Sequence, residues 1–208
     1  MNTIDVPQGS PEWLQARAGL VTASRISDIL ARVKTGEAAS RRNYKAHIVA
    51  EILTGQPQES GFTSQEMRWG TEQEPYARAA YEIQKNVMVD QVGLVLHPTI
   101  ARCGASPDGL VDPDGLVEIK CPNTATHIEN LIAKAAPAHY HNQMLWQMAC
   151  TGRAWCDFVS FDPRMPERLQ ILVVRFPRDE ERIKAMEEEV SRFLAEVNSQ
   201  IALLEAAA

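Results

Sequence analysis

The stretch SPDGLVDPDGLVEIKCP, residues 106–122, combines two short apolar runs with several charged side chains. The letters DPDG, residues 112–115, are a strong turn signal, and the apolar residues on either side favour strands. We therefore predict a β-hairpin whose strands carry carboxylates and a lysine at positions where a core would place apolar side chains.

Pairing across this turn determines which charged residues meet. A turn centred in the middle of DPDG places Asp108 opposite roughly Ile119, and therefore beside Glu118 or Lys120. Along a strand, Glu118 and Lys120 point to one face and Ile119 points to the other. The hairpin therefore predicts that a carboxylate of one strand lies close to a carboxylate and an ammonium group of the next.

The chemistry of such a group favours a divalent cation. Two neighbouring carboxylates repel each other, and a pKa rises unless a cation lies between them. Ligands that are all oxygen suit Mg²⁺ or Mn²⁺, and with a lysine that holds a water molecule they are suited to phosphodiester hydrolysis. The simpler interpretation is a solvated hairpin with an incidental Glu–Lys pair. A calcium loop is excluded, because the twelfth position from Asp112 is Asn123, where glutamate is needed.

The composition limits the class of protein. A chain of 208 residues with 45% hydrophobic residues predicts one domain spanning 1–208, whose residues from about 178 to 208 form a charged C-terminal helix. The net charge of −6 argues mildly against a protein that coats nucleic acid. Most of this charge comes from the stretch after residue 177, so it does not exclude a phosphate-bearing substrate.

The chain shows no run of about 18 apolar residues and no signal peptide, so we expect neither a membrane span nor a membrane partner. The four cysteines form no CxxC pair and no zinc pattern. We expect them to be reduced and buried, in a cytoplasmic protein.

Periodicity and capping signals predict helices first, then strands, two further helices, a strand pair and a final helix. The helices are expected at 10–17, 22–33, 41–53, 64–85, 123–133, 137–150 and 178–204. The strands are expected at 87–97, 101–111, 115–121, 155–161 and 169–176. Residues 55–64 should form a loop, and Pro75 should kink or restart its helix. This order predicts a mixed α/β layer fold.

The segments Pro107-Asp108 and Glu118-Ile119-Lys120 resemble the signature of PD-(D/E)xK nucleases. Further blocks agree, in the order EWLQARAGLVTAS (12–24), WGTEQEPYAR (69–78), SPDGL (106–110), GLVEIKCP (115–122) and HYHNQMLWQMACTG (139–152). Together they resemble viral recombinases of the lambda-exonuclease type, also called alkaline exonucleases, from about residue 11 to 165. The resemblance implies an α/β fold with a restriction-endonuclease-like core, in which helices flank a central mixed β-sheet. N-terminal helices and a long C-terminal helix complete it.

The resemblance also implies a function. It predicts a Mg²⁺-dependent 5′-to-3′ exonuclease that degrades one strand from linear double-stranded DNA ends to mononucleotides. The remaining 3′ single-strand overhang would serve a single-strand annealing protein. A two-metal site, with Mn²⁺ as a substitute for Mg²⁺, and a homotrimer ring around DNA are further expectations of the resemblance.

The candidate site residues come from the same resemblance. Asp108 and Glu118 match the metal-binding acids, and the Ile119 carbonyl matches a backbone ligand. Lys120 matches the lysine that positions the attacking water. Glu74 matches a further acid near the metal, although a single helix glutamate is more often a surface residue.

A glutamine of the following helix completes the match. Gln143 matches a residue that helps to hold the nucleophile, and Gln147 lies one turn further along the same helix face. The choice of Gln143 rests on Tyr140 and Thr151 as anchors. The ordinary alternative is a polar residue on the solvent face of a helix.

Four residues match a pocket for the 5′-phosphate, namely Arg17, Thr22, Ser24 and Ser106. A guanidinium group binds a phosphate through two parallel hydrogen bonds, and hydroxyls at a helix N-terminus add donors where the dipole favours an anion. Helix capping is the ordinary alternative for Thr22 and Ser24. Arg17 taken alone would more often be a solvated helix residue.

Residues outside these motifs also bear on how DNA would be bound. Arg41, Arg42 and Lys45 are candidates for phosphate contacts. The tryptophans at 13, 69, 146 and 155 are expected in the core. Because Pro75 directly follows Glu74, it can displace that acid from the site.

Two other functions remain open. A related sequence-specific endonuclease would need a base-reading element in the major groove, and the sequence shows no basic recognition helix. A nuclease with an iron–sulfur centre would need clustered cysteines, and these are scattered. A non-catalytic DNA-end-binding subunit would not need Asp108, Glu118 and Lys120 together.

Overall fold

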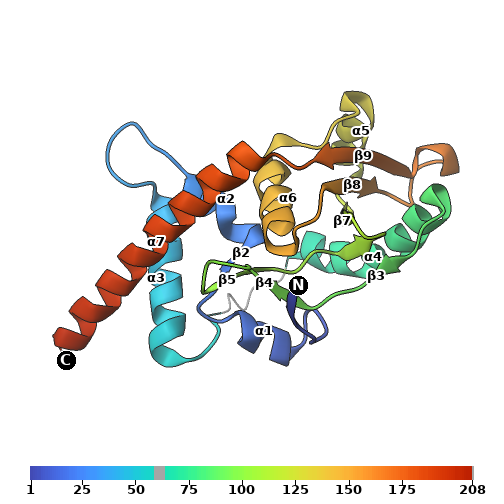
Figure 1. Cartoon of the computed structure of the whole chain (residues 1–208). Coiled ribbons are helices and arrows are strands. Elements are labelled where there is room, and N and C mark those ends of the chain that lie inside the picture. Colours follow the sequence, from blue (N-terminus) through green and yellow to red (C-terminus); the bar gives the residue numbers. More distant parts are fainter. Residues whose placement is uncertain (59–63, 208) are drawn as a thin grey trace.

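The computed structural model describes residues 1–58 and 64–207 (Figure 1). The loop expected at 55–64 therefore lies largely outside the described residues. The described chain forms two β-sheets with helices on both sides, which confirms the predicted mixed α/β fold and the long C-terminal helix. None of the described helices is long and apolar enough to cross a membrane.

The larger sheet has the strand order β3-β6-β7-β8-β9 and contains the hairpin. Its strands are β3 (Val89–Asp90), β6 (Gly109–Val111), β7 (Gly115–Lys120), β8 (Trp155–Phe161) and β9 (Ile171–Pro177). Strands β7 and β8 are parallel, and the other neighbours are antiparallel. The parallel pair requires a crossover, which α5 (Thr124–Ala133) and α6 (Ala138–Thr151) provide.

The smaller sheet has the order β1-β4-β5-β2. Its strands are β1 (Asn2–Ile4), β4 (Leu94–Leu96), β5 (Cys103–Ala105) and β2 (Val21–Thr22). The parallel pairing of β2 with β5 places Thr22 opposite Gly104. The N-terminal part of the chain is thereby held beside the segment that leads into the hairpin.

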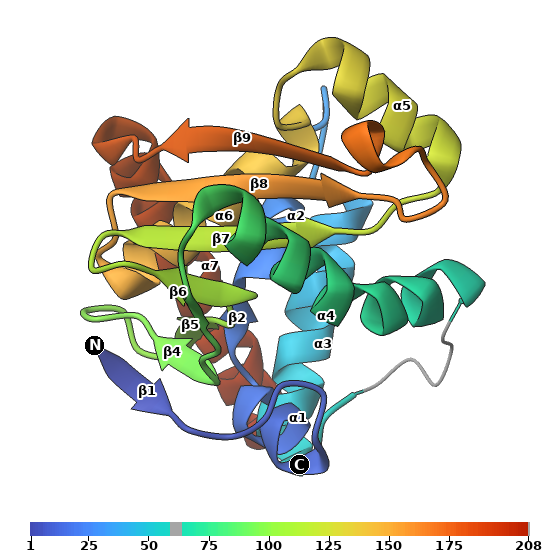
Figure 2. The same ribbon diagram turned by 90° about the vertical axis from the view of Figure 1, so that its right-hand side faces the viewer.

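Helices cover the two faces of the larger sheet (Figure 2). On one face, Val117 and Ile119 of β7 pack with Ala77 and Tyr81 of α4 (Gln65–Lys85). On the other face, Leu116 packs in the main core with apolar residues of α6. Because side chains alternate along a strand, Glu118 shares the α6 face with Leu116.

The main core also includes N-terminal and C-terminal helices. These are α2 (Ile26–Leu30), α3 (Ala39–Thr54) and α7 (Glu180–Ala206), together with Ala23 of a 3₁₀ turn at Ala23–Arg25. Helix α1 (Pro11–Arg17) has no buried residue and is not part of this core. A second 3₁₀ turn, at Glu167–Leu169, has no buried residue. All four cysteines are free and buried, as expected.

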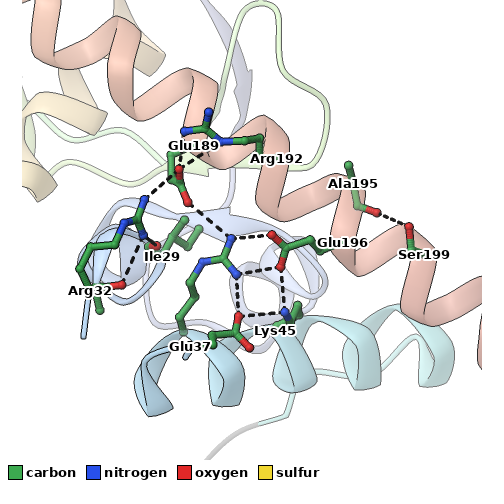
Figure 3. A network of polar contacts seen from close by, with 11 residues as sticks. Ile29, Arg32, Glu37, Lys45, Glu189, Arg192, Ala195, Glu196 and Ser199 are labelled. Atoms are coloured by element: carbon green, nitrogen blue, oxygen red, sulfur yellow. Dashed lines mark hydrogen bonds and ion pairs between the residues drawn. The ribbon is translucent and has the colours of Figure 1, made fainter. Parts of the chain in front are cut away.

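A group of ion pairs joins α3 to α7, and we call it the helix cluster (Figure 3). Arg41 binds Glu196 through both terminal nitrogens at 2.7 and 2.8 Å, and Lys45 binds the same carboxylate at 2.8 Å. Glu37 accepts from both bases, and Glu189 lies 3.5 Å from Arg41. The expectation that Arg41 and Lys45 contact DNA phosphates is therefore wrong, because both are buried among carboxylates.

Three elements differ from those predicted. The strand expected at 101–111 is split into β5 of the smaller sheet and β6 of the larger sheet. The strand expected at 87–97 is split into β3 and β4, which belong to different sheets. Gly93 lies between them, where a Cβ would come within 2.3 Å of the Ile4 carbonyl oxygen. The helix expected at 22–33 is replaced by β2, a 3₁₀ turn and the short α2, because residues 21–22 pair with β5 instead.

Helix α4 keeps its predicted bounds closely and runs through Pro75 without a break. It bends along its course, so the expected kink is seen and the restart is not (Figure 2). Ser64 caps its first turn by accepting a hydrogen bond from the Met67 amide. Glu74 is therefore carried on a continuous helix that faces the larger sheet.

Candidate active site

The hairpin brings the predicted acids together. Its register pairs Gly109 with Val117, one residue away from the predicted pairing, so Asp108 extends β6 toward Glu118. The Ile119 amide donates a hydrogen bond of 2.6 Å to Asp108 Oδ2. This bond fixes the Asp108 side chain across the hairpin and confirms the predicted proximity.

Glu118 is fully buried and accepts hydrogen bonds on both oxygens. Lys120 Nζ and Gln143 Nε2 donate to Oε1, the latter at 2.6 Å. Gln147 Nε2 donates to Oε2, also at 2.6 Å. We call Asp108, Glu118, Lys120, Gln143 and Gln147 the hairpin cluster.

The electrostatics of the hairpin cluster are unbalanced, because Asp108 and Glu118 share one lysine. Burial and the neighbouring charge of Glu118 raise the pKa of Asp108 well above its ordinary value. Burial lowers the pKa of Lys120, but the charges of Glu118 and Asp108 outweigh it and raise the pKa overall. Lys120 is therefore a cation, and it lies 5.2 Å from the centre of the Tyr140 ring.

Glu74 lies near the hairpin cluster without joining it. Its Oε1 accepts a 2.5 Å hydrogen bond from Arg78, one turn further along α4. Glu74 and Asp108 line the same cleft, with a volume of about 760 Å³, and the charge of Glu74 also raises the pKa of Asp108. The proline that follows Glu74 has not removed it from the site.

The four residues predicted to hold a 5′-phosphate meet in one cavity of about 130 Å³. Arg17, Thr22, Ser24 and Ser106 all line it. Gln143 of the hairpin cluster lines the same cavity, so one side chain belongs to both places. The structure thus brings the predicted phosphate-binding residues and the predicted metal-binding residues to one location.

Arg17 is the only cation among the residues that line this cavity. Its guanidinium group lies 3.9 Å from the centre of the Trp13 ring, and burial lowers its pKa. Arg17 forms no ion pair with any of the described residues. The Thr22 side chain makes no capping hydrogen bond, so helix capping does not account for its hydroxyl.

Three contributors were not assigned from the sequence. Trp13 is not a core residue, because it lines the cavity and donates 2.9 Å from Nε1 to the Ser106 hydroxyl. Gln8 lines both the cavity and the cleft and donates to the Pro107 carbonyl at 2.8 Å. Gln147 was noted only for its helix face, and that spacing was the available signal.

The residues present fit a hard divalent cation that retains water ligands. Within residues 1–58 and 64–207, no three histidine, cysteine or acidic side chains gather closely enough to hold a metal alone. Mg²⁺ is commonly held by one or two carboxylates together with water and substrate phosphates. Asp108 and Glu118 provide two carboxylates whose mutual repulsion a cation would relieve.

Comparisons with known proteins point to one family. The model of the YqaJ-like viral recombinase domain matches residues 12–154. The crystal structure of LHK-Exo, an alkaline exonuclease from Laribacter hongkongensis, is 48% identical in sequence with a TM-score of 0.87. It covers 95% of this chain, and the match covers 97% of that protein. The same protein in complex with dAMP matches over the same shares with a TM-score of 0.89.

A more distant structure supports the fold alone. A phage-related exonuclease from Haemophilus somnus 129PT is 17% identical, with a TM-score of 0.72. That match covers 89% of this chain and 96% of the other. No curated protein matches the chain.

Proposed function

The chain belongs to the YqaJ-like viral recombinase family, as its sequence motifs predicted, and on this premise we propose a specific activity. Membership and the alkaline exonuclease relative support a DNA exonuclease. We propose that it is Mg²⁺-dependent, acts 5′-to-3′ on linear double-stranded DNA ends, and releases mononucleotides. The remaining strand would carry a 3′ overhang.

One observation carries this proposal. The cavity that contains Arg17 shares Gln143 with the hairpin cluster. A terminal phosphate bound by Arg17 would therefore lie next to the groups that hydrolyse a phosphodiester. Cleavage that leaves the phosphate on the 5′ side of the next nucleotide regenerates the same type of end. This geometry favours repeated removal of single nucleotides from a 5′ end.

Each residue has a defined task in the proposed reaction. Asp108 and Glu118, with the Ile119 carbonyl, would hold Mg²⁺, which lowers the pKa of bound water and offsets charge on the phosphate. Lys120 remains protonated, so it orients the attacking water as a donor and does not serve as a base. Gln143 donates a hydrogen bond to Glu118 and would face the bound end from the cavity wall. Glu74 would accept a hydrogen bond from water in the cleft it shares with Asp108.

Water adds to phosphorus, and the bond from phosphorus to the 3′ oxygen of the terminal nucleotide breaks. The products are a nucleoside 5′-monophosphate with a free 3′ hydroxyl and a strand shortened by one residue. The relative crystallised with dAMP binds a molecule of this product class. Thr22, Ser24 and Ser106 would donate hydrogen bonds to the terminal phosphate beside Arg17.

Further parts of the proposal rest on the family alone. A homotrimer ring, a single-strand annealing partner, a second metal ion and Mn²⁺ as a substitute are expected from it. The single domain over 1–208 and the cytoplasmic location come from the sequence. The alternatives are a related endonuclease and a DNA-end-binding subunit without activity.

The test is digestion of three duplex substrates with and without Mg²⁺. Linear DNA with 5′-phosphate ends, linear DNA with 5′-hydroxyl ends and closed circles are compared, with products resolved by chromatography. We expect 5′-phosphorylated ends to be degraded fastest to 5′-mononucleotides, and circles to survive.

Equal cleavage of circles would identify an endonuclease instead. Binding of ends without cleavage at any Mg²⁺ concentration would identify a binding subunit. Mononucleotide release beginning at 3′ ends, read with end-labelled strands, would contradict the proposed polarity.

A further inference from the structure

Gln147 is the innermost member of the hairpin cluster. Its side chain lies in α6, one turn beyond Gln143, and is fully buried. Its Nε2 donates to Glu118 Oε2, while its own Oε1 has no hydrogen-bond partner among the described residues. A buried polar atom without a partner is costly, and an apolar side chain of this size would avoid that cost.

The orientation of the Gln147 amide is fixed by its neighbour. If the amide were turned over, its oxygen would face a carboxylate oxygen at 2.6 Å, which is repulsive. Thr151 further holds this turn of α6 by donating 2.8 Å to the Gln147 carbonyl. In the described part of the chain, the hydrogen bond to Glu118 is the side-chain interaction that explains a buried amide at this position.

The two oxygens of Glu118 have different surroundings. Among residues 1–58 and 64–207, the hydrogen-bond donor found for Oε2 is the buried amide of Gln147. Oε1 meets Lys120, whose side chain is 29% exposed, and Gln143, which lines the cavity with Arg17. The Oε1 donors can therefore rearrange when substrate enters, whereas the Oε2 donor is enclosed by packed side chains.

We propose that Gln147 is a positioning residue that restricts Glu118 to a single metal-binding oxygen, Oε1. This inference rests on the proposed Mg²⁺-dependent function. With one lone pair of Oε2 held by Gln147, binding of one ion through both oxygens of Glu118 is disfavoured. Gln143 and Lys120 are the exchangeable donors, and Gln147 remains bonded to Glu118 throughout the reaction.

The consequence is discrimination between divalent cations. Ca²⁺ accepts carboxylates that bind through two oxygens and tolerates irregular geometry, while Mg²⁺ requires a compact octahedron. A glutamate limited to one oxygen therefore disfavours Ca²⁺ relative to Mg²⁺. Removal of the Gln147 amide frees Oε2 and should shift the preference toward Ca²⁺.

The experiment measures Mg²⁺ and Ca²⁺ affinities of the whole protein by calorimetric titration, without DNA. Gln147→Met is the main variant, and Gln147→Leu serves if the first does not fold by circular dichroism. Partners of metal ligands alter affinity roughly 10- to 100-fold. We expect the ratio of Ca²⁺ to Mg²⁺ affinity to rise about tenfold. The matched control, Gln143→Met, removes a donor to the other oxygen and should leave the ratio near wild type.

The outcomes separate this inference from the proposed function. An unchanged ratio in both folded Gln147 variants, with tight Mg²⁺ binding in the wild type, overturns the role of Gln147 alone. A parallel fall in both affinities would show a merely structural residue and also overturns it. Absence of saturable Mg²⁺ binding in the wild type would instead count against the proposed metal dependence.

Discussion

The hairpin cluster on β6–β7 and the helix cluster between α3 and α7 are both built from carboxylates and bases. The helix cluster has at least as many bases as acids, since Arg32 and Arg192 also bind Glu189. The hairpin cluster has two acids for one lysine. Hydrogen bonds from Arg41 lower the pKa of Glu196 to about 2, whereas burial and Glu118 raise that of Asp108.

The same residue types therefore have opposite consequences. In the helix cluster each carboxylate meets bases that favour its charged form, so the group stabilises the packing of α7 on α3. In the hairpin cluster the charged form of Asp108 is disfavoured, which is typical of sites where function outweighs stability. The types of residue do not distinguish the helix cluster from the hairpin cluster. The number of bases per carboxylate does.

The largest expected effect compares two lysines that each bind a glutamate. Lys120→Met should lower the single-turnover rate of DNA cleavage by roughly 10²- to 10⁴-fold, because the water loses its donor. Lys45→Met should retain the wild-type rate per folded molecule. Its free energy of unfolding should fall by roughly 1–3 kcal/mol, measured in urea, because Glu37 and Glu196 lose a base. A comparable loss of rate in both variants would abolish the distinction.

The second comparison concerns two arginines. Arg17→Met should reduce the preference for 5′-phosphate over 5′-hydroxyl ends roughly 10- to 100-fold, because hydrogen bonds to charged groups contribute about 1.5–3 kcal/mol. The ratio of kcat/KM for the two ends is the measurement. Arg41→Met serves as control, because its guanidinium is already engaged by Glu196 and Glu37. An unchanged preference in Arg17→Met would remove Arg17 from the phosphate pocket.

The smallest effect is the dependence of stability on pH. The folded pKa of Glu196 is about 2, below the ordinary value, so its stabilising contribution is present above about pH 4.3 and lost as pH falls toward 2. The side chain is 41% exposed, so screening limits this contribution to about 1 kcal/mol. Urea unfolding from pH 5 to 3 should show a shallower decline for Glu196→Gln than for the wild type.

Asp108 should show the reverse in metal-free buffer. Its folded pKa is raised, so its favourable contribution is present at low pH and lost as pH rises through that pKa. Asp108→Asn keeps an acceptor for the Ile119 amide and should remove this loss. If the contributions of Glu196 and Asp108 to the free energy of unfolding changed in the same direction with pH, the comparison would be contradicted.

Local signals predicted most of the fold. Ser10, Ser64 and Asn123 cap their helices as expected, and DPDG forms the predicted turn. The failures lie where distant segments decide the structure. Residues 21–22 became a strand because they pair with β5, some eighty positions away, and Gly93 divides a strand because another segment passes close to it.

The site residues were likewise predicted where local spacing decides their contacts and missed where distant segments do. The spacing of Asp108, Glu118 and Lys120 identified the hairpin cluster, because turn geometry alone brings them together. Arg41 and Lys45 were misassigned because their partners lie in α7, about 150 residues later. Gln147 shares a face with Gln143, but only the packed structure shows that both reach Glu118.

The central claim is that Asp108 and Glu118, which share one lysine, bind a divalent cation, whereas the carboxylates of the helix cluster are already neutralised by bases. The most direct test is the melting temperature of the wild type, Asp108→Asn and Glu196→Gln, each with and without Mg²⁺. An ion that binds the folded state at 100 times its Kd adds about 2.7 kcal/mol, or roughly 5 to 10 °C for a chain of this length. We predict that increase for the wild type and Glu196→Gln, and none for Asp108→Asn. An undiminished increase in Asp108→Asn, or its loss in Glu196→Gln, would contradict the account.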